Sequence, residues 1–363
     1  MEDDGGFRSG VTPLVEYGLL KVHGPDAASF LQNQLTNDVA SLADGAVRLA
    51  GYCSVKGRLL ASFWVWREVE TQAFWLACSR DIAASTAKRL SMFVMRAKAK
   101  VEDVSDAFAL LGRVKVADSS DGLPALEGAF ALPLPRLVLS GRLAAALNPA
   151  LIETAQDIDI ERALHPVAAP ALEQTLQQMT ATGARMLPTS LWRRLEVLSG
   201  VARISAASQD LFVPQMVNFE LVDGVSFRKG CYPGQEVVAR SQYLGKLKRR
   251  MFLGLAAGEL PAPGADVMAT AASVGQPAGP AEPVGQVVLA APLAAESGSR
   301  RFVVLFESVA AAVGEPDDPK AAVLHVGESP VTRLPLPYAI PPVAPKSPPG
   351  ARGLAAATPD DAA

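Results

Sequence analysis

Residues 227–240 read Phe-Arg-Lys-Gly-Cys-Tyr-Pro-Gly-Gln-Glu-Val-Val-Ala-Arg. Gly230 and Gly234 allow the backbone to turn tightly or to approach another group closely, and the proline between them fixes one φ angle. The Gln-Glu pair that follows falls where a helix would begin, so backbone N–H groups, the thiol and the cationic side chains can converge there. The stretch therefore predicts either a glycine-rich turn that caps a short helix or a binding site.

The same stretch contains the pattern Lys-Gly-Cys-Tyr-x-Gly-Gln-Glu, and two further blocks lie upstream of it. Residues 212–218 read Phe-Val-Pro-Gln-Met-Val-Asn, and residues 31–39 read Leu-Gln-Asn-Gln-Leu-Thr-Asn-Asp-Val. Together these blocks resemble the YgfZ family of folate-binding proteins. That family is related to the T-protein (aminomethyltransferase) of the glycine cleavage system and includes a mitochondrial iron–sulfur assembly factor. The resemblance covers about residues 11–340.

The resemblance implies an α+β fold, in which two ferredoxin-like, T-protein-like α+β domains surround a central cavity and a small β-barrel follows. From Gly245 onward, short β-rich runs separated by Gly and Pro are typical of such a barrel. After Leu334 the chain is rich in proline and alanine, which predicts disorder. The expected division is a disordered N-terminus over residues 1–10, a folate-binding region of two interleaved domains over 11–245, a barrel domain over 246–338 and a disordered tail over 339–363.

Hydrophobic periodicity predicts the individual elements. The expected strands of the first region span residues 11–21, 47–54, 58–67, 72–79, 99–104, 107–114 and 136–140, and residues 118–135 form a connection. The expected helices span residues 26–32, 81–95, 141–147, 169–182 and 188–199, and Gly200 ends the last of these as its C′ residue. In the barrel, β-rich runs span residues 248–255, 264–270, 284–290, 301–307 and 321–326.

Composition is that of an ordinary soluble globular protein, with 49% hydrophobic and 20% charged residues in a chain of 363. The first residues, Met-Glu-Asp-Asp-Gly-Gly, are acidic and unlike a signal peptide. No apolar run is long enough to span a bilayer. We therefore expect a cytoplasmic protein that has no membrane partner.

Cysteine and histidine usage predicts no metal site. The three cysteines, Cys53, Cys78 and Cys231, share no C-x-x-C spacing, and the three histidines stand far apart. Cys53 and Cys78 lie in expected strands, where cysteine acts as a small buried hydrophobe. Cys231 lies close to Lys229 and Arg228, whose positive potential favours a thiolate, so Cys231 with Lys229 is the candidate functional thiol. The alternative is that Cys231 is buried and inert.

A folate site needs donors and acceptors along the pterin edge, apolar or aromatic walls, and cations for the glutamate tail. The resemblance implies tetrahydrofolate or a one-carbon derivative as the ligand, and the candidate residues that supply these groups are Gln34, Thr36, Asn37, Lys56, Arg58, Asn218, Arg228, Tyr232, Gln235 and Glu236. The glycine turns at residues 56–58 and 228–230 are expected to border one hole. A structural alternative makes Thr36 or Asn37 the N-cap of a helix.

The implied function is folate binding that supports the assembly or repair of iron–sulfur enzymes, including those for tRNA modification. Iron–sulfur proteins or their assembly machinery are the expected partners, and tRNA is an indirect one. A first alternative is a folate-dependent aminomethyltransferase, which needs carboxylates beside the folate. The T-protein glutamate position, aligned on Gly200, is Leu198 here, and the catalytic aspartate position falls on Leu60 or Ala61, so no independent catalysis is expected. A second alternative is an RNA- or tRNA-binding module, against which the net charge of −3 counts.

Overall fold

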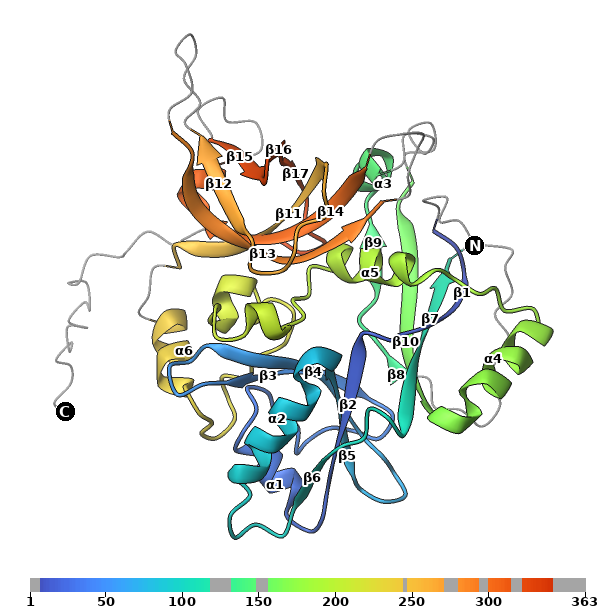
Figure 1. Ribbon diagram of the computed structural model, residues 1–363. Helices are drawn as coiled ribbons and strands as arrows, with labels where there is room; N and C mark the ends of the chain where they lie inside the picture. Colours follow the sequence, from blue (N-terminus) through green and yellow to red (C-terminus); the bar gives the residue numbers. More distant parts are fainter. Residues whose placement is uncertain are drawn as a thin grey trace, which may run out of the picture.

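The computed structural model describes residues 7–117, 132–147, 156–243, 247–270, 280–293, 300–314 and 322–341. These residues form three sheets whose strands all pair antiparallel, together with helices that cover them (Figure 1). The molecule is thus an α+β protein with two helix-covered sheets and a barrel-like third sheet, as the sequence predicts.

The first sheet is built mainly from the N-terminal hundred residues. Its strand order is β3 (Val47–Cys53), β4 (Leu59–Arg67), β5 (Phe74–Ser79), β2 (Tyr17–His23) and β6 (Lys100–Asp103). Two helices, α1 (Ala27–Gln32) and α2 (Arg80–Met92), pack on one face of it. Phe30 and Leu90 from the helices share a buried cluster with Phe63 from β4, because alternate residues of each strand point to this face.

The second sheet joins residues that are far apart in sequence. Its strands are β1 (Gly10–Pro13), β7 (Phe108–Val116), β10 (Ile158–Ala168) and β8 (Leu132–Pro133), in that order, with β9 (Leu137–Leu139) paired to β10. Its helices are α3 (Gly141–Leu147), α4 (Leu172–Ala181) and α5 (Thr189–Leu198). In Figure 1 α4 lies at the outer side of this sheet, whereas α5 lies between it and the barrel.

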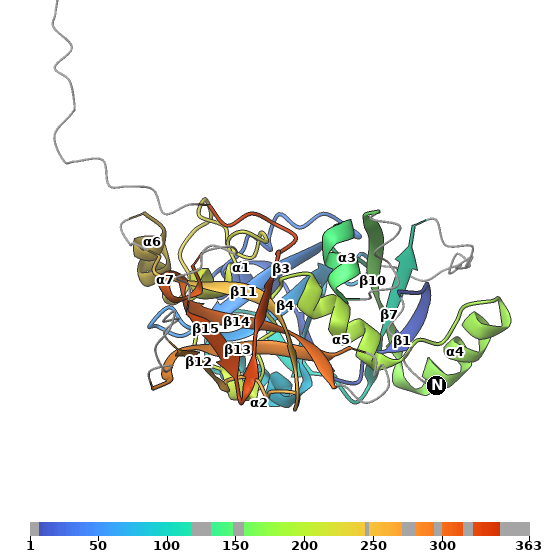
Figure 2. The ribbon, with the colours of Figure 1, turned by 90° about the horizontal axis from the view of Figure 1, so that it is seen from above.

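The third sheet has seven strands and curls into a barrel-like form (Figure 2). Its order is β16 (Ser329–Pro330), β15 (Val323–Val326), β12 (Asp266–Thr270), β13 (Glu282–Pro292), β14 (Arg301–Val309), β11 (Arg249–Ala257) and β17 (Thr332–Leu334), and α7 (Ala310–Val313) follows β14. Helix α5 packs on β13 and β14, so Leu195 shares the largest core cluster with Leu305 of the barrel and Trp64 of the first sheet.

Two strand predictions differ from the structure. The run 11–21 is two strands in different sheets, since β1 pairs with β7 and β2 pairs with β5 and β6. Pro13, which has no N–H to donate, ends β1, and the chain then crosses to the first sheet. The long strand β10 has no counterpart in the sequence prediction, although it pairs with three other strands.

The chain ends also differ in detail from the expected division. Residues 7–10, placed with the disordered N-terminus, belong to the fold, because Ser9 is buried and its Oγ accepts a hydrogen bond from the Val116 N–H at 3.0 Å. At the other end Ile340 packs against the barrel core. Residues 1–6 and 342–363 lie outside the described residues, as do residues 118–131 of the connection predicted over 118–135. The described end of that connection differs from the prediction, because Leu132–Pro133 form β8 and pair with β10.

Candidate functional site

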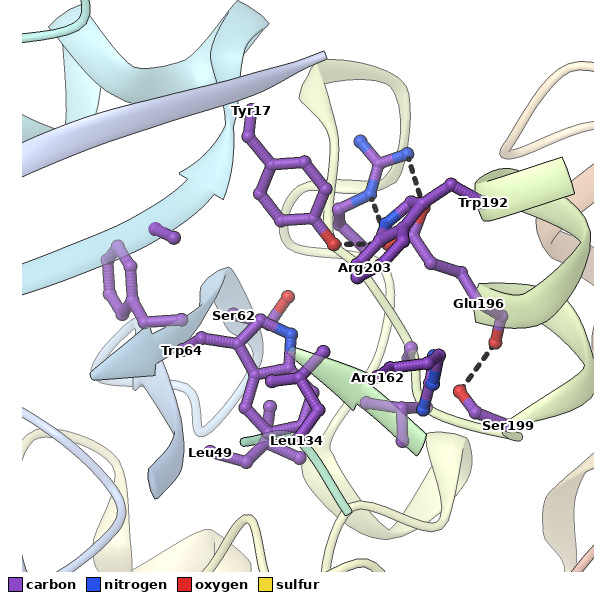
Figure 3. A pocket seen from close by; sticks show the side chains of 14 residues that line it. Tyr17, Leu49, Ser62, Trp64, Leu134, Arg162, Trp192, Glu196, Ser199 and Arg203 are labelled. Carbon is purple, nitrogen blue, oxygen red and sulfur yellow. Dashed lines mark hydrogen bonds and ion pairs between the residues drawn. The ribbon is translucent and has the colours of Figure 1, made fainter. Parts of the chain in front are cut away.

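A hollow lies where the first sheet, the second sheet and α5 meet (Figure 3). The volume of this cavity is about 20 Å³. That space suffices for water but not for a ring system. Its polar lining comes from Tyr17, Ser62, Arg162, Glu196, Ser199 and Arg203, and its aromatic walls include Trp64 and Trp192.

Glu196 is the centre of a buried ionic network beside this hollow. Its carboxylate accepts hydrogen bonds from the Tyr17 hydroxyl and from Arg203 Nε, the latter at 3.1 Å. Arg203 also donates to Ser79 Oγ at 2.8 Å and to Glu16 at 3.1 Å. Burial, followed by the neighbouring Glu196 carboxylate, raises the pKa of Tyr17 far above its usual range. Tyr17 is therefore a neutral hydrogen-bond donor at every physiological pH.

Arg162 reaches the hollow from β10 and is buried, with 4% of the residue exposed. Its Nη1 donates to the Leu195 carbonyl at 3.3 Å, and its Nε has no hydrogen-bond partner among the described residues. Burial lowers the pKa of Arg162, and the nearby Glu196 carboxylate opposes this shift. Ser62 Oγ, on the facing strand β4, accepts the Ile204 N–H at 2.9 Å.

Lys229 joins the motif at 227–240 to the block at 31–39. Its Nζ donates to the carbonyl oxygens of Gln32 and Leu35, the latter at 2.6 Å, and lies 5.0 Å from the centre of the Tyr232 ring. Burial lowers the pKa of Lys229 to about 8, although Asp38 and Cys231 act in the opposite direction. Tyr232 is itself buried. Two sequence blocks almost 200 residues apart are thus brought together by one cation on the carbonyl end of α1.

Thr36 and Asn37 form hydrogen bonds with the backbone of β3 and with the backbone of the segment just before the motif. Thr36 Oγ1 donates to the Gly224 carbonyl at 2.6 Å and accepts the Gly51 N–H at 2.7 Å. Asn37 Nδ2 donates to the carbonyls of Leu49 at 2.8 Å and Asp223 at 2.6 Å. No helix begins here, so the N-cap interpretation is wrong. The neighbouring Gln34 has a buried Oε1 that lacks a partner among the described residues.

The two glycine turns pack against each other. Gly57 and Gly234 have φ angles of 71° and 79°, and a Cβ built on Gly57 would lie 2.8 Å from Val237 Cβ. Arg58 donates from Nη1 to the carbonyls of Asp210, at 3.3 Å, and Leu211, whereas Lys56 is exposed. Contact between the turns is made by the Gly234 end of the motif rather than by its Arg228–Gly230 end.

The remaining candidates are spread between the barrel and the surface. Asn218 adopts a left-handed conformation, and its Nδ2 donates to the Met251 carbonyl at 2.8 Å, which ties it to β11. Gln235 begins α6 (Gln235–Tyr243), where Glu236 is exposed and lies 3.8 Å from Arg240. Arg228 is exposed.

Burial separates the three thiols. Cys53 and Cys78 are buried, which confirms that prediction, and Cys231 is exposed, so the interpretation of Cys231 as a buried thiol is wrong.

None of the candidate site residues named from sequence is among the described residues that line the hollow. The sequence analysis did not name the charged and phenolic side chains that line it, which are Tyr17, Arg162, Glu196 and Arg203. One signal was available for Glu196, because it stands among apolar residues on the buried face of α5, where a carboxylate needs a partner. Leu198, at the T-protein glutamate position, is fully buried in the core.

Comparison with known proteins identifies the family. Residues 8–114 match the profile of the GCVT N-terminal domain. The tRNA-modifying protein YgfZ of Edwardsiella ictaluri is 34% identical over 238 residues, which cover 64% of this chain and 67% of the relative. The chain belongs to the YgfZ family. Another YgfZ, from Vibrio vulnificus, is 34% identical over 244 residues, which cover 67% of this chain and 68% of the relative.

The fold of this YgfZ-family chain is similar to that of the glycine cleavage system aminomethyltransferase T from Bartonella henselae. The TM-score is 0.57 at 15% sequence identity, over 91% of this chain and 86% of that protein. The similarity supports the T-protein-like fold expected from the sequence. Across the described residues we find no group of three or more His, Cys, Asp or Glu side chains that could hold a metal ion, and no helix there is long and apolar enough to cross a membrane.

Proposed function

We propose that this YgfZ-family chain binds tetrahydrofolate or a one-carbon derivative, and that folate binding supports the assembly or repair of iron–sulfur enzymes, including those that modify tRNA. The observation that carries the proposal is the hollow at the junction of the two sheets and α5. Family membership and the names of the relatives, which are tRNA-modifying proteins, agree with it.

The lining of the hollow fits the chemistry of a pterin. Trp64 and Trp192 supply aromatic walls, and Arg162 and Ser62 supply polar groups at the edge. Because the open space is only water-sized, binding requires the lining side chains to move apart. A folate bound there would change the surroundings of two of the four tryptophans in the chain.

We assign the sequence-predicted residues to two supporting roles. Asn37 holds a wall of the site, since its Nδ2 donates to the carbonyl of Leu49, which lines the hollow. Thr36, Asn218 and Lys229 join the surrounding segments through hydrogen bonds to their backbone. The exposed loop that carries Cys231 and Arg228, with the exposed Lys56 nearby on the packed turn, serves the folate tail or an iron–sulfur partner. Gln34, Arg58, Tyr232, Gln235 and Glu236 stay candidates within these two groups.

Aminomethyl transfer is the less favoured function. It needs a carboxylate that can meet the folate nitrogens. Glu196 is the carboxylate among the described lining residues, and Tyr17 and Arg203 already occupy it. We therefore expect no aminomethyl turnover above background.

Isothermal titration of the full chain with tetrahydrofolate, methylene-tetrahydrofolate and tRNA tests the proposal. We expect folate binding, no direct tRNA binding, and a change in tryptophan fluorescence on adding folate. Trp192→Phe should reduce that change, whereas Trp66→Phe should keep it, because Trp66 stacks on Trp75 away from the hollow lining. If the chain binds no folate, the proposal is overturned, whether or not the chain binds tRNA.

A further inference from the structure

Arg162 is a buried cation that lacks an anionic partner. It forms no ion pair with a described residue, and its hydrogen bond within the described part of the chain runs from Nη1 to the Leu195 carbonyl at 3.3 Å. A guanidinium has five N–H donors, and Nε, for one, is buried without an acceptor among the described residues. Leaving a buried charge and its donors unsatisfied is costly, so the hollow that Arg162 lines must supply oxygen acceptors.

Glu196, the carboxylate that lines the hollow, does not accept a hydrogen bond from Arg162. The Glu196 carboxylate accepts the Tyr17 hydroxyl and two nitrogens of Arg203, at 3.1 and 3.4 Å from Nε and Nη2. Arg203 is further held by Glu16. Glu196 is thus committed to Arg203 and Tyr17, and it affects Arg162 only through space.

A second lining residue adds another donor. Ser62 Oγ accepts the Ile204 N–H, so its hydroxyl hydrogen is left to donate, and it has no acceptor among the described residues. At the position where a T-protein carboxylate would accept hydrogen bonds, this chain has the buried Leu198. The polar groups of the hollow that still need a partner are therefore donors.

We propose that the hollow recognises the oxo edge of its ligand, with Arg162 and Ser62 donating to a ring carbonyl oxygen. The inference rests on the proposed function and assigns recognition of the 4-oxo group, which every folate carries, to Arg162 and Ser62. A 4-amino pteridine would present N–H donors to the donors of Arg162, leaving both sides unpaired. The competing explanation is that ordered water alone solvates Arg162, since about 20 Å³ is enough for a water molecule.

The experiment compares two ligands that differ in the substituent at ring position 4 and in the proton on the neighbouring N3. Tetrahydrofolate and its 4-amino counterpart with the same tail are titrated against the full chain by calorimetry. We expect the wild type to bind the 4-oxo ligand roughly tenfold or more tighter, because hydrogen bonds to a charged donor are strong. Arg162→Met should bring the ratio of the two affinities close to one, and Arg162→Lys should keep part of it. Arg80→Met, which removes a surface arginine paired with Asp106, should leave the ratio unchanged.

Thermal unfolding of each variant shows whether it folds. If Arg162→Met does not fold, Arg162→Lys and Ser62→Ala carry the test, and both should lower the ratio. An unchanged ratio in both, or equal binding of the two ligands by the wild type, overturns the inference and leaves the proposed folate binding intact. Failure of the wild type to bind any folate overturns the proposed function itself.

Discussion

At the scale of single residues, burial divides the three cysteines into two kinds. Cys53 and Cys78 lie inside the first sheet, where burial raises the pKa of Cys53 to about 12 and that of Cys78 still higher. Cys231 is exposed in the loop before α6. Since the thiolate is the reactive form and must be reached by the reagent, we expect iodoacetamide at neutral pH to modify Cys231 at least roughly tenfold faster than the other two. Peptide mass spectrometry measures the three rates.

The proposed role of the Cys231 loop in supporting iron–sulfur enzymes leads to a second prediction for this thiol. Cys231→Ser should preserve the melting temperature and folate binding while reducing the activity of iron–sulfur enzymes in a strain that depends on this chain. Cys78→Ala, at a buried position outside the loop, is the control for a general loss of stability. Equal labelling of all three thiols, or a silent Cys231→Ser, would make Cys231 a residue of the loop without a role in chemistry.

For the motif at residues 227–240, the sequence predicts the chemical character of the segment but not the contacts of its side chains. The residue types of the motif pointed to a cationic, polar segment, but their partners could not be read locally. Lys229 bonds to carbonyls almost 200 positions upstream, and Glu196 meets Tyr17 across a separation of 179. A buried ionic network assembled from distant segments leaves no spacing pattern in the sequence.

At the scale of elements, the two glycine turns pack together immediately before α6 begins at Gln235. Gly234 has a φ of 79°, and a Cβ there would lie 2.6 Å from Gly57 Cα. Gly234→Ala should therefore lower the stability by more than the about 1–2 kcal/mol of left-handed strain alone. Gly230→Ala is the matched control in the same loop, because its Cβ would point into open space and its φ lies outside the left-handed region.

Thermal melting followed by circular dichroism compares these two glycine variants. We expect a drop of several degrees for Gly234→Ala and no measurable change for Gly230→Ala. Similar melting temperatures for both would mean that the turn contact adjusts, and that the motif glycine is not required for the packing of α6.

Strand β10 illustrates why elements can be missed. Its sequence, Ile-Asp-Ile-Glu-Arg-Ala-Leu-His-Pro-Val-Ala, carries charges and a proline, which count against a central strand. The strand forms because its neighbours cover it: β7 pairs along nearly its full length, and β8 and β9 pair on the other edge. Tertiary context outweighs local propensity here. The strands β3, β4 and β5, by contrast, are rich in β-branched and aromatic residues and lie close to their predicted bounds.

At the scale of the whole molecule, the three sheets share one core. The largest buried cluster contains Trp64 from the first sheet, Leu164 from the second and Leu305 from the barrel, with α5 between them. The resemblance to the T-protein relatives predicted this division into parts, whereas periodicity alone predicted only the elements. Which side chains would line the hollow between the parts depends on the packing angles of whole sheets, and short-range pattern does not contain that information.

The Glu196 network connects α5 to the first sheet and to the segment between β1 and β2, so its loss should lower the stability of the fold. Arg203 contacts Glu16 between β1 and β2, Ser79 at the end of β5, and Glu196 on α5. Glu196→Gln leaves Arg203 with one carboxylate in place of two, and removing one partner of a buried ion pair costs about 3 kcal/mol or more. We expect a melting temperature lower by several degrees, whereas the exposed Glu236→Gln should change it little.

A double-mutant cycle measures how much of the effect of Glu196→Gln on stability comes from its interaction with Tyr17. Tyr17→Phe removes the hydroxyl that Glu196 accepts and should destabilise the fold on its own, because a buried acceptor loses its donor. If the two side chains act together, the double variant Tyr17→Phe/Glu196→Gln should lose less stability than the sum of the single variants. Strict additivity, or an unchanged melting temperature for Glu196→Gln, would show that the two sheets and α5 are held by their apolar core alone.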